Sequence, residues 1–134
     1  MANLTASRPD QRQEGVLIDV NLAAATKVFA GSNVNFGATG LGKKASDTAS
    51  EVFAGVAMET KDSALTADPS QSYVRVWTEG VFSMNCTGAS AAWEGKDVFA
   101  VDDNLVALAA TTTNDVRVGK VVKYVSATEV RVKI

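Results

Sequence analysis

The chain has 134 residues and a mass of 14.0 kDa, a size that suits one domain with one core and needs no disulfide to fold. Thirteen basic and fifteen acidic residues give a net charge of −2. This balance argues against a nucleic-acid surface, because phosphate recognition depends on clustered Lys and Arg. No apolar run approaches the ~20 residues of a membrane helix, so we expect a soluble protein with neither nucleic acid nor membrane as a partner.

Residues 1–14 are polar and predict an extended N-terminal arm that cannot pack into a core of its own. No basic region followed by an apolar stretch opens the chain, so we expect no secretory signal and synthesis in the cytosol. Two roles stay open for the arm, a dispensable tail and an anchor that orders on a partner. The residues that would make contacts in the second case are Arg8, Pro9, Asp10, Gln11, Arg12, Gln13 and Glu14.

Residues 15–134 are typical of a single β domain. Apolar and polar residues alternate over 16–22, which predicts a half-buried strand. Residues 27–31 and 51–55 are two pentads in which a charged residue is followed by Val-Phe-Ala-Gly, and residues 98–100 repeat Val-Phe-Ala. This unit is typical of a short strand that runs into a bulge or turn.

Further strands follow in chain order. Residues 37–50 and 60–71 predict long surface loops around a strand at 52–59. A strand at 72–78 is followed by the turn Glu79-Gly80, which predicts that residues 81–86 return as its hairpin partner. Two more hairpins are expected, one turning at residues 102–104 and one at residues 126–128. Roughly eight to ten strands and no convincing helix predict an all-β fold, a compact small barrel or sandwich built of hairpins.

The strand at 72–78 carries the candidate binding surface. Val74 and Val76 alternate with Tyr73, Arg75 and Trp77, so valines that face the core leave the other three side chains on the outer face. Tyr, Arg and Trp are enriched at protein interfaces. We consider two readings: a protein interface, and a stripe packed beneath a neighbouring loop with Arg75 between the rings.

Candidate chemistry is sparse, because the chain has no His and one Cys. Cys86 shares a strand face with apolar residues and is expected to be a buried structural thiol. Lys44 with Ser46 would be a weak Ser-Lys dyad, since no strained turn accompanies it. A calcium site would draw its oxygen ligands from the following residues: Asp97, Asp102, Asp103 and Asn104. Turn formation is the favoured role of Asp102 and Asp103, and we expect no enzyme, cofactor or metal.

Several short segments also occur in a characteristic order. They are Val28-Phe29-Ala30-Gly31-Ser32, Ala45-Ser46-Asp47-Thr48-Ala49 leading into Gly55-Val56-Ala57, Tyr73-Val74-Arg75-Val76-Trp77 with Gly80-Val81-Phe82, Gly95-Lys96-Asp97-Val98-Phe99 with Asp102-Asp103, and Val118-Gly119-Lys120-Val121-Val122. In this order they resemble the small capsid cement, or head decoration, proteins of tailed bacteriophages. The resemblance covers about residues 26–134 and rests on the order, because each segment alone is nonspecific. Lys44 departs from the pattern, since members often have proline there.

The resemblance implies a β domain on the outer surface of the mature virion. Members of this family often form trimers and clamp neighbouring copies of the major capsid protein, so the expected partners are that protein and further copies of this chain in a homotrimer. A β-structured adhesive or carbohydrate-binding module of a virion fibre or tail is the alternative, in which Tyr73, Trp77 and Trp93 would stack on sugar rings.

Overall fold

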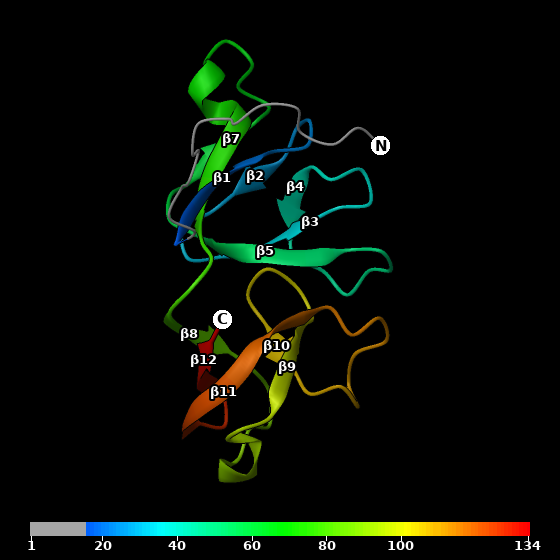
Figure 1. The fold of residues 1–134 in the computed structure, drawn as a ribbon, viewed down its shortest axis with the longest axis vertical. Coiled ribbons are helices and arrows are strands. Elements are labelled where there is room, and N and C mark those ends of the chain that lie inside the picture. The colour runs from blue at the N-terminus through cyan, green and yellow to red at the C-terminus, as the bar shows by residue number, and fades with distance from the viewer. Residues whose placement is uncertain (1–15) are drawn as a thin grey trace, which may run out of the picture.

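The computed structural model describes residues 16–134, and this part of the chain is mostly β, as predicted (Figure 1). The residues of the predicted arm, Arg8–Glu14, lie outside the described part. The strands form two five-stranded antiparallel sheets and one two-stranded sheet. Within residues 16–134 no helix is long and apolar enough to cross a membrane.

The first sheet has the strand order β1-β7-β5-β3-β4. Its strands are β1 (Leu17–Asn21), β3 (Asn33–Phe36), β4 (Gly42–Lys44), β5 (Val52–Ala57) and β7 (Tyr73–Trp77). A separate pair beside this sheet consists of β2 (Lys27–Val28) and β6 (Lys61–Asp62), and the 3-10 helix η1 (Pro69–Ser72) precedes β7. The two outer strands meet where Leu22 bridges Gly42, so the sheet curls toward a small barrel.

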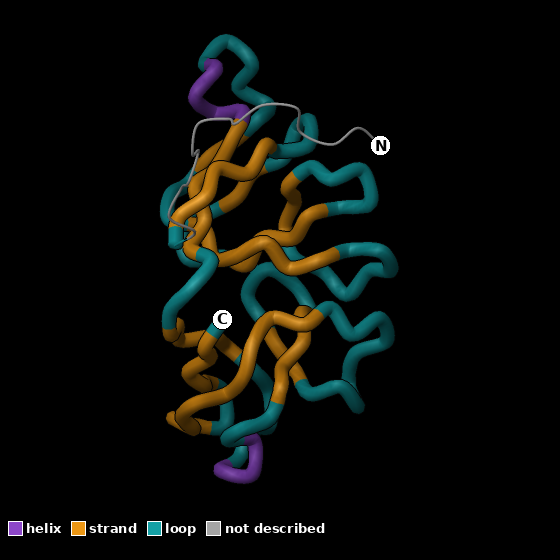
Figure 2. The backbone as a smooth tube through the Cα atoms, in the orientation of Figure 1, coloured by secondary structure: helices purple, strands orange, loops and turns teal. Residues whose placement is uncertain are grey.

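The second sheet has the order β10-β9-β11-β12-β8. Its strands are β8 (Val81–Asn85), β9 (Asp97–Ala100), β10 (Val106–Ala107), β11 (Arg117–Ser126) and β12 (Glu129–Lys133), with the 3-10 helix η2 (Ala91–Trp93) before β9. Asn85 and Leu105 bridge its outer strands. The two sheets occupy the two ends of the long axis of the molecule, with η1 and η2 at opposite extremes (Figures 1 and 2).

The two sheets share one topology, so the chain consists of a first unit (residues 16–78) and a second unit (residues 80–134). In each unit the first strand pairs with the last, the last pairs with the longest central strand, and that strand pairs with a hairpin formed earlier in the chain. Strands β1, β3, β4, β5 and β7 therefore correspond to β8, β9, β10, β11 and β12.

The correspondence extends to individual residues. In the pairing of first and last strands, Leu17 faces Trp77 and Val81 faces Lys133. In the central pairing, Val34 faces Gly55 and Val98 faces Gly119, each beside a bulge. The same backbone bonds recur in the loops, since Gly31 N–H donates to Ala57 O and Gly95 N–H donates to Val121 O, both at 2.8 Å. Corresponding residues of the two units are separated by a constant number of positions in the sequence as far as β5 and β11. Between β7 and β12 this separation is shorter, because the first unit carries the additional segment with β6.

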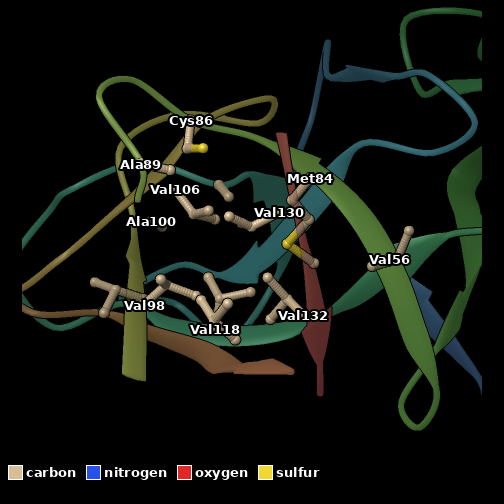
Figure 3. Packing of buried hydrophobic residues seen from close by; sticks show 13 residues of the cluster. Val56, Met84, Cys86, Ala89, Val98, Ala100, Val106, Val118, Val130 and Val132 are labelled. Carbon is tan, nitrogen blue, oxygen red and sulfur yellow. The ribbon is translucent and has the colours of Figure 1, made fainter. Parts of the chain in front are cut away.

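Instead of the expected single core, the described residues contain two buried clusters that meet at β5. The first cluster lies within the first unit and includes Ala54 and Ala57, whereas Val56 belongs to the second cluster and Phe53 packs against it. The bulge at Gly55 allows β5 to present side chains to both clusters. Figure 3 shows Val56 of β5 at the margin of the second cluster, apart from the valines of the second sheet.

Two sequence-based assignments were wrong. Residues 81–86 do not return to β7, because β1 and β5 occupy both edges of β7, and β8 pairs with β12 in the other sheet. The predicted loops 37–50 and 60–71 contain the short strands β4 and β6. The other two predicted hairpins, β9–β10 and β11–β12, are confirmed.

Candidate binding surface

The outer face of β7 presents the predicted stripe. Val74 and Val76 are fully buried, as predicted, and the three alternating side chains lie on the opposite face of the strand. Arg75 is exposed, whereas Tyr73 and Trp77 are half-buried. The stripe therefore offers one charged and two aromatic groups on a strand whose backbone is fixed by pairing on both edges.

Charged neighbours surround the stripe. Arg75 Nε lies 3.4 Å from Asp19 Oδ1 on β1, directly across the strand pair. Lys61 Nζ lies 4.5 Å from the centre of the Tyr73 ring and 3.5 Å from Glu59 Oε1. Lys61, rather than Arg75, is thus the cation over a ring of the stripe. The exposed ion pair of Arg75 with Asp19 is worth roughly 0–1 kcal/mol, so it orients the two side chains more than it stabilises the sheet.

The second unit shows that this fold does not require the aromatic side chains of the stripe. The residues at the same register positions of β12 are Glu129, Arg131 and Lys133. The valines beneath them, Val130 and Val132, are as fully buried as those of β7. The same kind of strand is therefore built once with charged side chains alone on its outer face and once with two aromatic side chains beside an arginine, so the strand pairing itself does not require the aromatic residues of β7.

Trp93 does not join Tyr73 and Trp77. It lies in η2, where it packs against the buried cluster of the second unit, at the far end of the molecule from η1 (Figure 2). Its counterpart in the first unit is Phe29, since Ser32 N–H donates to Phe29 O as Lys96 N–H donates to Trp93 O. The three aromatic residues therefore do not form one platform for a sugar.

Two of the candidate calcium ligands, Asp97 and Asp102, have other partners. Asp102 Oδ1 accepts the N–H groups of Asn104 and Leu105, both at 2.8 Å, which confirms its predicted role in the turn. Asp97 Oδ1 lies 3.1 Å from Arg117 Nη2. Within residues 16–134 no group of three or more His, Cys, Asp or Glu side chains is placed to hold a metal ion.

Cys86 is buried, as predicted, in the second cluster. Burial raises the pKa of its thiol, and the nearby charge of Glu129 raises it further. Its counterpart in the first unit is Leu22, since Cys86 N–H donates to Thr128 O as Leu22 N–H donates to Ser72 O. The thiol therefore takes the place of an apolar side chain.

A buried polar network was missed by the sequence reasoning. Lys43, not Lys44, reaches Ser46, with 3.2 Å from Lys43 Nζ to Ser46 Oγ. Lys43 Nζ also donates to Glu51 Oε2 at 2.6 Å, and Ser46 Oγ donates to Glu51 Oε1 at 2.9 Å. Asn35 Nδ2 donates to the same Oε1 at 3.1 Å. Burial alone would raise the pKa of Glu51, but these hydrogen bonds and the charge of Lys43 outweigh it and lower the pKa.

A second polar contact ties the two units together through their loops. Asp47 accepts the backbone N–H groups of Thr113 and Asn114 on its two carboxylate oxygens, both at 2.8 Å. In return, Asn114 Nδ2 donates to the Asp47 carbonyl oxygen at 3.0 Å. These bonds lower the pKa of Asp47, the Thr113 N–H having the largest effect. A carboxylate that accepts two backbone N–H groups is a strong, directional link.

The described surface also has two shallow hollows. One lies where the units meet and is lined by residues including Phe29, Ser32 and Asp103. The other is lined by residues including Lys27, Lys43 and Lys44. Neither contains an arrangement of nucleophile and base.

No protein-family model, curated protein or solved structure matches this chain.

Proposed function

We propose that this protein is a capsid decoration, or cement, protein that binds the outer surface of a mature phage head and clamps neighbouring major capsid subunits. The collinear segments between residues 26 and 134 suggest the family. The aromatic stripe Tyr73-Arg75-Trp77 supports a binding role, because the matching strand of the second unit is built without it. In this proposal the protein acts by adhesion rather than catalysis, and its partners are the major capsid protein and further copies of the chain in a homotrimer.

The stripe suits a protein contact for a physical reason. Half-buried aromatic residues on a strand lose little side-chain freedom when a partner covers them. Trp, Tyr and Arg are also the residues whose removal most often costs ~2 kcal/mol or more at an interface. We propose that the stripe lies in a subunit or capsid contact, and that Arg8–Glu14 add contacts as an anchor.

A decoration titration tests this proposal. Purified heads that lack the protein are mixed with increasing amounts of wild type, Trp77→Ala or Lys133→Ala. Lys133 is the matched control, because it holds the register position of Trp77 in the second unit. We expect Trp77→Ala to bind at least tenfold more weakly, about 1.4 kcal/mol, and Lys133→Ala to bind within twofold of wild type.

Thermal melts of the three proteins show whether each is folded. Wild type that stays in solution with the heads would contradict the cement role itself. Equal binding by Trp77→Ala and Lys133→Ala would leave that role standing and remove the stripe from the interface. Binding to glycans on an array, lost in Trp77→Ala, would favour the adhesive alternative.

A further inference from the structure

The network around Glu51 brings together an amine, a carboxamide and a carboxylate. Asn35 on β3 and Lys43 on β4 face each other in the register of the hairpin. Glu51 lies between their side chains, accepting Lys43 Nζ at 2.6 Å on one oxygen and Asn35 Nδ2 at 3.1 Å on the other. The nitrogen atoms of a lysine and an asparagine on adjacent strands are therefore held by one carboxylate.

The network is largely buried, and one of its acceptors has no hydrogen-bond partner. Asn35 is 0% exposed and the Glu51 side chain is 4% exposed. Asn35 Oδ1 accepts no hydrogen bond from any described residue, and a buried acceptor without a partner costs about 1–3 kcal/mol. The Lys43 side chain, at 36% exposed, is the member through which the network reaches the surface.

The second unit is an internal control for this network. Phe99 and Ala107 face each other there at the positions of Asn35 and Lys43. Ala107 is buried and Phe99 is half-buried. This hairpin therefore forms with apolar or small side chains at both positions, so its geometry does not call for an amide and an amine.

We propose that Lys43 and Asn35 join in an intramolecular isopeptide bond, with Glu51 as the catalytic residue. The reaction begins with transfer of a proton from the Lys43 ammonium to Glu51 along their hydrogen bond. The uncharged Nζ then attacks Asn35 Cγ, forming the Nζ–Cγ bond. The Cγ–Nδ2 bond breaks as Glu51 relays protons from Nζ to Nδ2, so that one ammonium ion leaves and Glu51 ends as a carboxylate.

The atoms and charges of this reaction balance without an oxidant, a metal or a second substrate. One ammonium and one carboxamide become one secondary amide and one ammonium ion. Because the reacting groups belong to a single folded chain, their effective concentration is far above that of free molecules. One reaction for each molecule suffices, so the step need not be fast. The product would join β3 and β4 covalently at the outer edge of the first sheet.

Intact-mass spectrometry of the purified full-length protein tests the proposal. We expect a mass below that of the sequence by one ammonia molecule, and a proteolytic map in which the segment containing Asn35 is attached to the segment containing Lys43. Lys43→Arg and Glu51→Gln should each retain the full mass, whereas Lys44→Arg should lose ammonia like wild type. Circular dichroism then shows whether the variants are folded.

Two results would overturn the inference. One is a folded wild-type protein that still has the full sequence mass after prolonged incubation. The other is a loss of ammonia that persists in Lys43→Arg without a joined peptide, which would indicate ring closure of Asn35 onto its own backbone. These results are measured on the wild type and on Lys43→Arg, whose side chain reaches the surface. Neither result depends on whether the buried Asn35 tolerates substitution. The inference is independent of capsid binding.

Discussion

One glycine in each unit, Gly55 in the first and Gly119 in the second, sets how closely the central strand approaches the last strand. A Cβ atom added to Gly119 would lie 2.3 Å from the carbonyl oxygen of Lys133, and one added to Gly55 would lie 2.3 Å from that of Trp77. In both cases the obstacle is backbone of the last strand, which cannot rotate away as a side chain can. The same close approach in both units marks it as a requirement of this fold.

We therefore expect Gly119→Ala to lower the free energy of unfolding by about 1–3 kcal/mol, the range of overpacked cores. Gly37→Ala is the control, because its added Cβ would first meet the flexible Lys43 side chain, at 3.3 Å. Chemical denaturation monitored by tryptophan fluorescence measures both. A Gly119→Ala protein as stable as Gly37→Ala would show that β12 can shift without cost.

At the scale of elements, the loops that carry Asp47 and Thr113 connect the two units. Because the pKa of Asp47 is lowered by its bonds to Thr113 and Asn114, the folded state binds this proton less readily than the unfolded state does. The link is complete above the ordinary Asp pKa and is lost as the pH falls through the lowered value.

We expect the amide NMR signals of Thr113 and Asn114 to shift together, with a midpoint below the ordinary Asp pKa. In Asp47→Ala both signals should lose this titration and exchange with solvent faster, while the amides of β11 stay protected. Asp68→Ala is the control and should leave the Thr113 and Asn114 signals unchanged, because the pKa of Asp68 is lowered by Ser70 within its own turn. Unchanged exchange in Asp47→Ala would show that the loops are held by other contacts.

Sequence reasoning succeeded where alternation is strong and failed where pairing is distant. The alternating valines of β7 and β12 identified buried and outer faces because strand periodicity fixes them. Gly42-Lys43-Lys44 has no apolar residue, so neither β4 nor the face of each lysine could be assigned, and the network around Glu51 was missed. β8 was placed beside β7 because Glu79-Gly80 resembles a hairpin turn, but no turn signal reveals that both edges of β7 are taken.

At the scale of the whole molecule, the repeat of the two units is present in the sequence, but the pentads at 27–31 and 51–55 do not mark it. The two pentads lie in the same unit and do not correspond in the structure. Residues 29–34 and 93–98 do correspond, each with an aromatic residue, a glycine two positions on, and Asn-Val or Asp-Val. The repeat is therefore recognised by the chemical similarity of Phe to Trp and of Asn to Asp, and not by identical residues at these positions.

If the proposed function holds, the two-unit body adds contacts across capsid joints. A protein that binds only the intact particle stabilises it by mass action, so decorated heads should release DNA at a higher temperature than undecorated ones. The measurement is DNA release on heating, followed with a dye, with Trp77→Ala at the same concentration as the comparison. Superimposable release curves for decorated and bare heads would contradict the cement role.

The pairing of first with last strands also sets an order of events during synthesis. β1 lacks its ladder partner until β7 has been made, so the first sheet cannot be completed before residue 77 leaves the ribosome. Even then, Phe53 and Val56 on the far side of β5 lack the side chains that cover them in the finished protein. The first unit therefore emerges with an apolar face that its own residues do not cover, and the second unit protects that face when it folds.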